Sequence, residues 1–110
     1  MEIKRGDVVT CVFSREYGKP RPGVVVQSDL FNATHPSLTI CPITGVLHQA
    51  PLCRLTVTPS PKNGLKKRSQ VMIDKLAPVR TPRVRDVIGH LTAAEMGEID
   101  QALKLWLGLS

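Results

Sequence analysis

Arg21 is the residue of this chain best suited to binding an anion. It stands in the segment Lys19-Pro-Arg-Pro-Gly-Val-Val-Val-Gln-Ser-Asp29, with a proline on each side. Because proline fixes φ, the loop around the arginine loses little conformational freedom on folding. A guanidinium group with five donors, held at the start of a β-branched strand, suits a phosphate or a carboxylate. The alternative is an ordinary surface arginine that flanks a strand.

Thr44 is the second candidate. It ends the apolar segment Leu38-Thr-Ile-Cys-Pro-Ile-Thr-Gly45, so its hydroxyl lies at the end of a predicted strand. A hydroxyl can donate one hydrogen bond and accept others. The alternative is that this threonine only completes the strand, because threonine is common in strands.

The elements that position these residues are short strands. Runs of β-branched residues predict strands over 8–14, 21–28, 38–44, 52–58 and 69–76, with a short further strand over 84–88. The continuous run Val24-Val25-Val26 predicts burial on both faces of its strand. Residues 29–34 could form one helical turn, and Pro78 to Pro82 is interpreted as a connector.

The last element is predicted to be a helix. Thr92-Ala-Ala-Glu95 is a capping box, in which each side chain bonds an unpaired amide of the first turn. Met96, Ile99, Leu103 and Trp106 then recur at three- and four-residue steps, and we expect this stripe, Trp106 included, to be buried. The pattern as a whole predicts one mainly β domain over residues 1–110, with a C-terminal helix.

The charge is strongly basic and unevenly placed. The chain of 110 residues carries a formal net charge of +6, with a sequence pI near 9.7. Residues 61–85 hold eight lysines and arginines against one acid, whereas residues 86–110 are mildly acidic. This balance favours a polyanionic partner that meets the 61–85 segment. The alternative for such a run is a solvated loop.

The cysteines and histidines predict neither a disulfide framework nor a metal site. Three cysteines, an odd number, are what a reducing cytoplasm allows. The spacing of Cys41, His48 and Cys53 matches no common structural zinc site. We expect no metal and no cofactor. There is no apolar run of membrane-spanning length and no signal-peptide pattern, so we expect a cytoplasmic protein without a membrane partner.

The order and spacing of these segments resemble the MazF/PemK (Kid) family of toxin endoribonucleases. The resemblance rests on the arginine–proline step into the Val24-Val25-Val26 strand and on the strand that ends at Thr44. It runs from Arg5-Gly-Asp-Val-Val9 to the C-terminal helix. It implies a small SH3-like barrel of five to six strands (CcdB/Kid toxin-like). It also implies a homodimer, and an antitoxin protein whose acidic C-terminal segment covers the basic groove.

The resemblance also implies an activity, namely metal-independent cleavage of single-stranded RNA. RNA supplies its own nucleophile, the 2′-OH, so the protein needs a base, charge stabilisation and a proton donor. Arg21 would stabilise the phosphorane and Thr44 would bond a non-bridging oxygen. Glu16 and Asp74 are both candidate bases; a solvated loop charge and an ion pair are their respective alternatives. One branch of the family has an arginine where this chain has Met72.

RNA contacts are expected from the basic residues and one aromatic residue. These are Tyr17, Lys19, Lys66, Lys67 and Arg68. Two other functions stay open on the same fold: a gyrase-poisoning toxin that binds through a C-terminal tryptophan, and a plain RNA-binding barrel. The predicted burial of Trp106 argues against the first of these, and fold alone does not decide among them.

Overall fold

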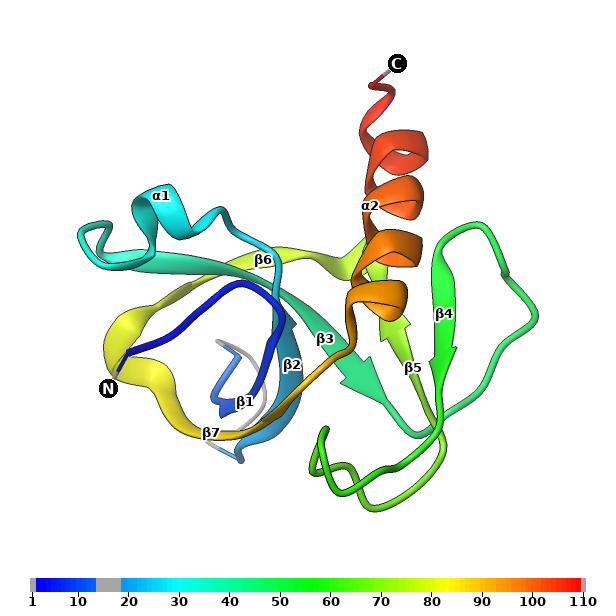
Figure 1. Cartoon of the computed structure of the whole chain (residues 1–110), viewed down its shortest axis with the longest axis horizontal. Coiled ribbons are helices and arrows are strands. Elements are labelled where there is room, and N and C mark those ends of the chain that lie inside the picture. The colour runs from blue at the N-terminus through cyan, green and yellow to red at the C-terminus, as the bar shows by residue number, and fades with distance from the viewer. Residues whose placement is uncertain (1, 14–18, 110) are drawn as a thin grey trace.

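The structure is a computed structural model that describes residues 2–13 and 19–109. It is a mainly β protein with a C-terminal helix, as predicted (Figure 1). The elements, in order, are β1 (Asp7–Cys11), β2 (Arg21–Val25), α1 (Asp29–Asn32), β3 (Ser37–Thr44), β4 (Arg54–Val57), β5 (Ser69–Met72), the 3-10 turn η1 (Ile73–Lys75), β6 (Ala77–Arg80), the 3-10 turn η2 (Thr81–Arg83), β7 (Val84–His90) and α2 (Ala93–Leu107).

In the described part of the chain, seven strands form one antiparallel sheet in the order β4-β5-β3-β2-β1-β7, with β6 also paired to β3. Strand β3 is long enough to hold two partners along one edge, because β6 pairs with Ser37–Ile40 and β5 with Ile43 and Thr44. Figure 1 shows β1, β2, β6 and β7 curling together in the left half, whereas β4 and β5 lie with α2 on the right. Among the described residues the strand pairing does not close into a ring.

Two apolar cores hold the sheet in this shape. One contains Val24 and Val26 and extends to Ile99 and Ala102 of α2. The other contains Val25 and lies inside the curl formed with β1, β6 and β7. The prediction that the Val24-Val25-Val26 run is buried on both faces is therefore confirmed, since alternate valines enter different cores. This double burial fixes β2, which carries Arg21 at its start.

Three predictions about the elements are wrong. The strand predicted over 69–76 ends at Met72, because η1 moves the chain from the second half of β3 to the first. The connector interpreted from Pro78 to Pro82 contains β6. Trp106 is 50% exposed rather than buried, because α2 continues past the apolar surface that covers Ile99 and Ala102.

The C-terminal helix begins at the predicted residues. The capping box is complete: the Thr92 hydroxyl accepts from the Glu95 amide at 3.1 Å, and the Thr92 amide donates to the Glu95 carboxylate at 2.8 Å.

All three cysteines are free thiols, and burial raises the pKa of the Cys11 and Cys41 thiols to about 12. No helix among the described residues is long and apolar enough to cross a membrane.

Candidate active site

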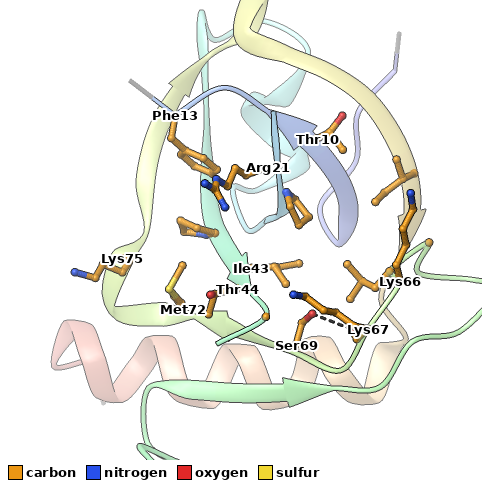
Figure 2. A pocket seen from close by; sticks show the side chains of 16 residues that line it. Thr10, Phe13, Arg21, Ile43, Thr44, Lys66, Lys67, Ser69, Met72 and Lys75 are labelled. Carbon is orange, nitrogen blue, oxygen red and sulfur yellow. Dashed lines mark hydrogen bonds between the residues drawn. The ribbon is translucent and has the colours of Figure 1, made fainter. Parts of the chain in front are cut away.

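Arg21 and Thr44, the two leading candidates from the sequence, line the same pocket (Figure 2). The pocket has a volume of about 780 Å³ and lies where the start of β2, the end of β3 and the segment before β5 meet. Three lysines line it as well, namely Lys66, Lys67 and Lys75. With Arg21 they make four cationic side chains among the described residues that line the pocket, an arrangement that favours an anionic ligand.

Strand β2 delivers Arg21 to the pocket. Arg21 is the first residue of β2 and pairs with Cys11, the last residue of β1. Cys11 is fully buried, and so are Val24 and Val25, which follow Arg21 in β2. The backbone around Arg21 is therefore anchored, whereas the arginine itself is exposed. Figure 2 places the Phe13 ring beside Arg21, with Thr44 and Met72 across the pocket.

Strand β3 delivers Thr44, and the local turn orients its hydroxyl. The Oγ1 atom of Thr44 accepts a hydrogen bond from the Val46 amide at 3.1 Å. This bond uses a lone pair of the oxygen, so the hydroxyl hydrogen stays available for donation into the pocket. The preceding residue, Ile43, is buried against Val71 of β5, which fixes the end of the strand.

The turn before the lysines is rigid. Asn63 is 2% exposed; its side chain accepts from the Ser60 and Leu65 amides and donates to the Thr58 carbonyl. Gly64 has a φ of +69°, which favours glycine, and it packs against the backbone of Ile88. The chain is therefore held against β7 at Gly64, just before the lysines at 66 and 67.

The lysine after that turn lies against the end of β3. A methyl group at Gly45 would overlap the Cε and Nζ atoms of Lys67, so the lysine side chain crosses directly over this glycine. The Ser69 hydroxyl donates to the Lys67 carbonyl at 2.8 Å and restrains its backbone. The ammonium group of Lys67 is thus held next to the residue that follows Thr44.

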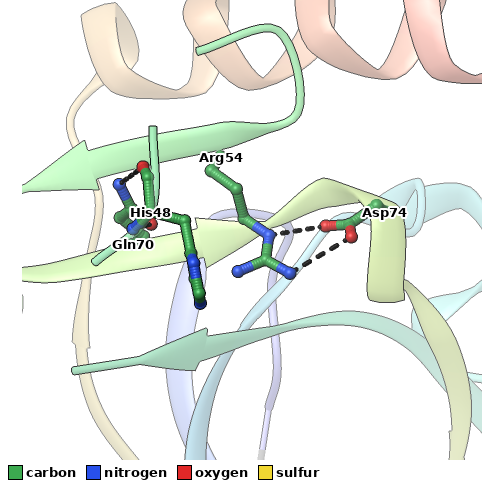
Figure 3. Close-up of polar contacts among 4 residues, drawn as sticks. All are labelled: His48, Arg54, Gln70 and Asp74. Atoms are coloured by element: carbon green, nitrogen blue, oxygen red, sulfur yellow. Dashed lines mark hydrogen bonds and ion pairs between the residues drawn. The ribbon is translucent and has the colours of Figure 1, made fainter. Parts of the chain in front are cut away.

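Asp74 lies in η1, not on a strand as predicted, and it forms an ion pair with Arg54 of β4 (Figure 3). Arg54 donates from Nε to one carboxylate oxygen at 2.8 Å and from a terminal nitrogen to the other at 3.2 Å. These hydrogen bonds hold the pKa of Asp74 below its ordinary value. Asp74 is not among the residues that line the pocket.

Sequence reasoning missed Arg54. It pairs in register with Met72, which does line the pocket, so the guanidinium group comes from the strand next to Met72. The sequence held one signal: alternation over 52–58 sets Arg54 and Thr56 on one face of the strand. The register that brings this face to Met72 depends on the connection between β4 and β5, residues 58–68, and could not be derived.

The other predicted site residues lie away from the pocket or outside the described chain. Glu16 and Tyr17 fall in residues 14–18, outside the described residues. Lys19 and Arg68 are exposed but do not line the pocket. Among the described residues there is no group of three or more histidines, cysteines or acids that could hold a metal ion.

Comparison with known proteins decides the family. Residues 4–107 match the model of the PemK-like, MazF-like toxins of type II toxin–antitoxin systems. The chain belongs to this family. It is 38% identical over 109 residues to a probable endoribonuclease MazF of Mycolicibacterium smegmatis, covering 98% of this chain and 99% of that one. It is 29% identical over 113 residues to the endoribonuclease EndoA of Bacillus subtilis, covering 99% and 97% respectively.

Solved structures carry the same fold. A mycobacterial endoribonuclease in complex with its cognate antitoxin superposes with a TM-score of 0.81 and 23% identity, covering 99% of this chain and 98% of that one. A MazE–MazF complex of Deinococcus radiodurans gives 0.82 and 21%, covering 100% and 99%. This MazF-like chain is therefore a homologue of endoribonuclease toxins, both in sequence and in fold.

Proposed function

We propose that this MazF-like toxin is a metal-independent, sequence-selective endoribonuclease that cuts single-stranded RNA, chiefly mRNA, in the pocket that Arg21 and Thr44 line. The observation that carries the proposal is the meeting of these two residues with three lysines in one pocket. A guanidinium group, a hydroxyl donor and several cations are the groups that stabilise a phosphorane and bind the flanking phosphates.

The reaction needs no nucleophile from the protein. The 2′-oxygen attacks the adjacent phosphorus, the bond from phosphorus to the 5′-oxygen breaks, and a 2′,3′-cyclic phosphate and a 5′-OH remain. The 2′-OH proton passes to a base, and the leaving 5′-oxygen takes a proton from an acid, a role for which Arg21 is only a secondary candidate. Arg21 stabilises the negative charge on the phosphorane, because a guanidinium group gives up its proton too reluctantly to be the main acid. The Thr44 hydroxyl donates to a non-bridging oxygen.

The contacts of Asp74 favour Glu16 as the base. Both carboxylate oxygens of Asp74 already accept hydrogen bonds from Arg54, and its pKa is lowered by them. A carboxylate with a lowered pKa, whose oxygens both already accept hydrogen bonds from a guanidinium group, takes a proton poorly. We therefore assign a structural ion pair to Asp74 and leave proton abstraction to Glu16.

The proposal places the toxin in the cytoplasm. It also includes two protein partners, an antitoxin and a second copy of the toxin. An antitoxin with an acidic C-terminal segment would compete with RNA for the cationic pocket, and the solved relatives include complexes with antitoxins. The toxin itself would be a homodimer. Exposed apolar side chains gather at the end of α2, among them Leu105, Trp106 and Leu107, and such a patch supports contact with another protein.

The test uses wild type, Arg21→Ala and Thr44→Ala on a mixed-sequence single-stranded RNA, with EDTA present throughout. Two control variants remove the same residue types elsewhere: Arg80→Ala at the end of β6 and Thr34→Ala after α1, both exposed. We expect cyclic-phosphate ends from wild type and from both controls. The two site variants should lose about a hundredfold or more, the usual cost of removing one donor to the transition state.

Each other outcome contradicts a distinct part of the proposal. Undiminished cleavage by both site variants would reject the site and keep the activity. Wild-type cleavage that appears only when EDTA is left out would reject metal independence. If wild type cut none of several RNAs, the gyrase-binding or plain RNA-binding function would take its place, and the exposure of Trp106 removes the burial argument against the first of these.

A further inference from the structure

Gln70 is a buried polar residue in the strand next to the pocket. It lies in β5, is 5% exposed, and pairs with Thr44 of β3 on one side and Thr56 of β4 on the other. Residues that pair directly across an antiparallel sheet project to the same face. The Gln70 side chain therefore lies on the face that carries the Thr44 hydroxyl.

The Gln70 amide clamps the backbone of His48 (Figure 3). Its oxygen accepts from the His48 N–H at 2.9 Å, and its nitrogen donates to the His48 carbonyl at 2.8 Å. One side chain thus satisfies both backbone groups of one residue, as a neighbouring strand would. A longer bond of 3.4 Å from the same nitrogen to the Thr56 hydroxyl orients the amide.

This clamp fixes the middle of the segment between β3 and β4, residues 45–53. The segment starts at the pocket with Gly45, and its side chains mostly point outward: Val46 is 63% exposed, Leu47 45% and Leu52 70%, and His48 is exposed as well. Aliphatic side chains offer phosphates no hydrogen-bond donor but can pack against the faces of unpaired nucleobases, and the ring of His48 can stack on one. Because the clamped segment begins at the pocket with Gly45, RNA bound in the pocket would bring nucleotides next to the scissile phosphate beside it.

We infer that Gln70 is a positioning residue that sets the sequence selectivity of cleavage by holding the 45–53 segment beside the pocket. The inference rests on the proposed function, since it needs RNA in the pocket. Gln70 itself touches no substrate. It fixes the backbone from which Val46, Leu47 and His48 meet the flanking bases.

The test compares Gln70→Leu with a matched glutamine. Gln27 clamps backbone at the other end of β3: its oxygen accepts from the Thr39 N–H at 3.1 Å, and its nitrogen donates to the Ser37 carbonyl at 3.1 Å. Wild type, Gln70→Leu and Gln27→Leu are given a randomised single-stranded RNA, and the 5′-hydroxyl ends are sequenced. Thermal unfolding and gel filtration are recorded for all three.

We expect Gln70→Leu still to cut RNA, but with the ratio of preferred to other sites lowered about tenfold or more, a change of the size that one altered pocket contact produces. Gln27→Leu should lose stability but keep the wild-type motif. An unchanged motif in Gln70→Leu, or the same change in both variants, would overturn the inference. So would a changed oligomeric state with the motif intact. If wild type fails to cut, the proposed function fails first.

A second variant keeps the inference testable if Gln70→Leu does not fold. The double substitution Val46→Ser and Leu47→Ser alters only exposed side chains, so the fold should persist. We expect this variant to cut RNA with a changed motif. Retention of the wild-type motif would show that the segment does not read the flanking bases and would refute the role assigned to Gln70.

Discussion

The smallest structural requirement of the pocket is the missing side chain at Gly45. The side chain of Lys67 lies across this glycine, and its ammonium group reaches the end of β3 beside Thr44 only because no methyl group stands in the way. Gly45 does not have a positive φ, so an alanine there is not strained by its backbone. A substitution at Gly45 can therefore displace one cation without destabilising the fold.

Gly45→Ala should displace the Lys67 ammonium group and lower RNA cleavage about tenfold, the effect of removing one charge-assisted hydrogen bond. The overlapped atoms form the flexible end of the lysine, so the thermal midpoint should change little. Single-turnover cleavage of one RNA by Gly45→Ala, Lys67→Ala and the double variant measures the effect. Because both changes remove the same interaction, the double variant should be no slower than Lys67→Ala.

The control for this pair is Gly97→Ala, which adds the same methyl group to open space on α2. It should leave the cleavage rate unchanged. Additive losses in the double variant would mean that Gly45 acts through something other than Lys67.

At the scale of elements, the ion pair between Arg54 and Asp74 joins β4 to η1 where the chain changes partner along β3. The two side chains are 13% and 20% exposed, so water screens the pair only partly. Their hydrogen bonds lower the pKa of Asp74, and a carboxyl with a lowered folded-state pKa stabilises the fold above its unfolded-state pKa. That contribution is lost as the pH falls through the folded-state pKa.

Asp74→Asn should therefore destabilise the protein by about 2 kcal/mol near neutral pH, the usual value of a hydrogen-bonded charged pair. The difference from wild type should be full above about pH 5 and should shrink below about pH 4, the ordinary range of an unfolded aspartate. Urea unfolding at several pH values measures it. Asp86→Asn, an exposed acid on β7, is the control and should show a much smaller difference.

The same variant tests the assignment of the base when its cleavage rate is measured against pH. If Asp74 is structural, the folded Asp74→Asn variant should keep the pH–rate profile of wild type. A lost acidic limb in that profile, with the protein still folded, would return Asp74 to the chemistry.

The elements also show what could be predicted from the sequence. The run of three valines predicted double burial correctly, because so many adjacent apolar side chains cannot all face water. The prediction that Trp106 is buried was wrong, because periodicity gives the apolar face of a helix but not the length of the surface against which the helix packs. The strand β6 was missed because Pro78 suggested a connector, yet a strand at the edge of a sheet tolerates a proline.

The candidate site was predictable in part for the same kind of reason. Arg21 and Thr44 stand at strand ends that can be read directly from the sequence, and both line the pocket. Arg54 and Gln70 gain their roles only from strand register across β4 and β5. Register is fixed by loop geometry and core packing, which local sequence patterns do not contain.

At the scale of the whole molecule, the basic segment divides into two groups. Lys66, Lys67 and Lys75 line the pocket with Arg21, whereas Arg80, Arg83 and Arg85 do not. Arg80 pairs opposite Ser37, at the end of β3 away from Thr44. Three of the eight cations of the 61–85 segment therefore line the pocket, so the net charge of the molecule does not measure the charge at the site.

Salt dependence distinguishes these two groups. Thr44→Ala is used for binding because we expect it to cleave slowly. Its binding of a short single-stranded RNA should weaken as salt rises, because each phosphate that a cation neutralises releases counterions. Adding Lys66→Gln and Lys67→Gln should reduce the slope of log affinity against log salt by about 1.4, at about 0.7 for each phosphate no longer neutralised. Adding Arg80→Gln and Arg85→Gln instead removes the same charge and should leave the slope nearly unchanged. Equal reductions in both double variants would mean that RNA follows the net charge of the molecule and not the pocket.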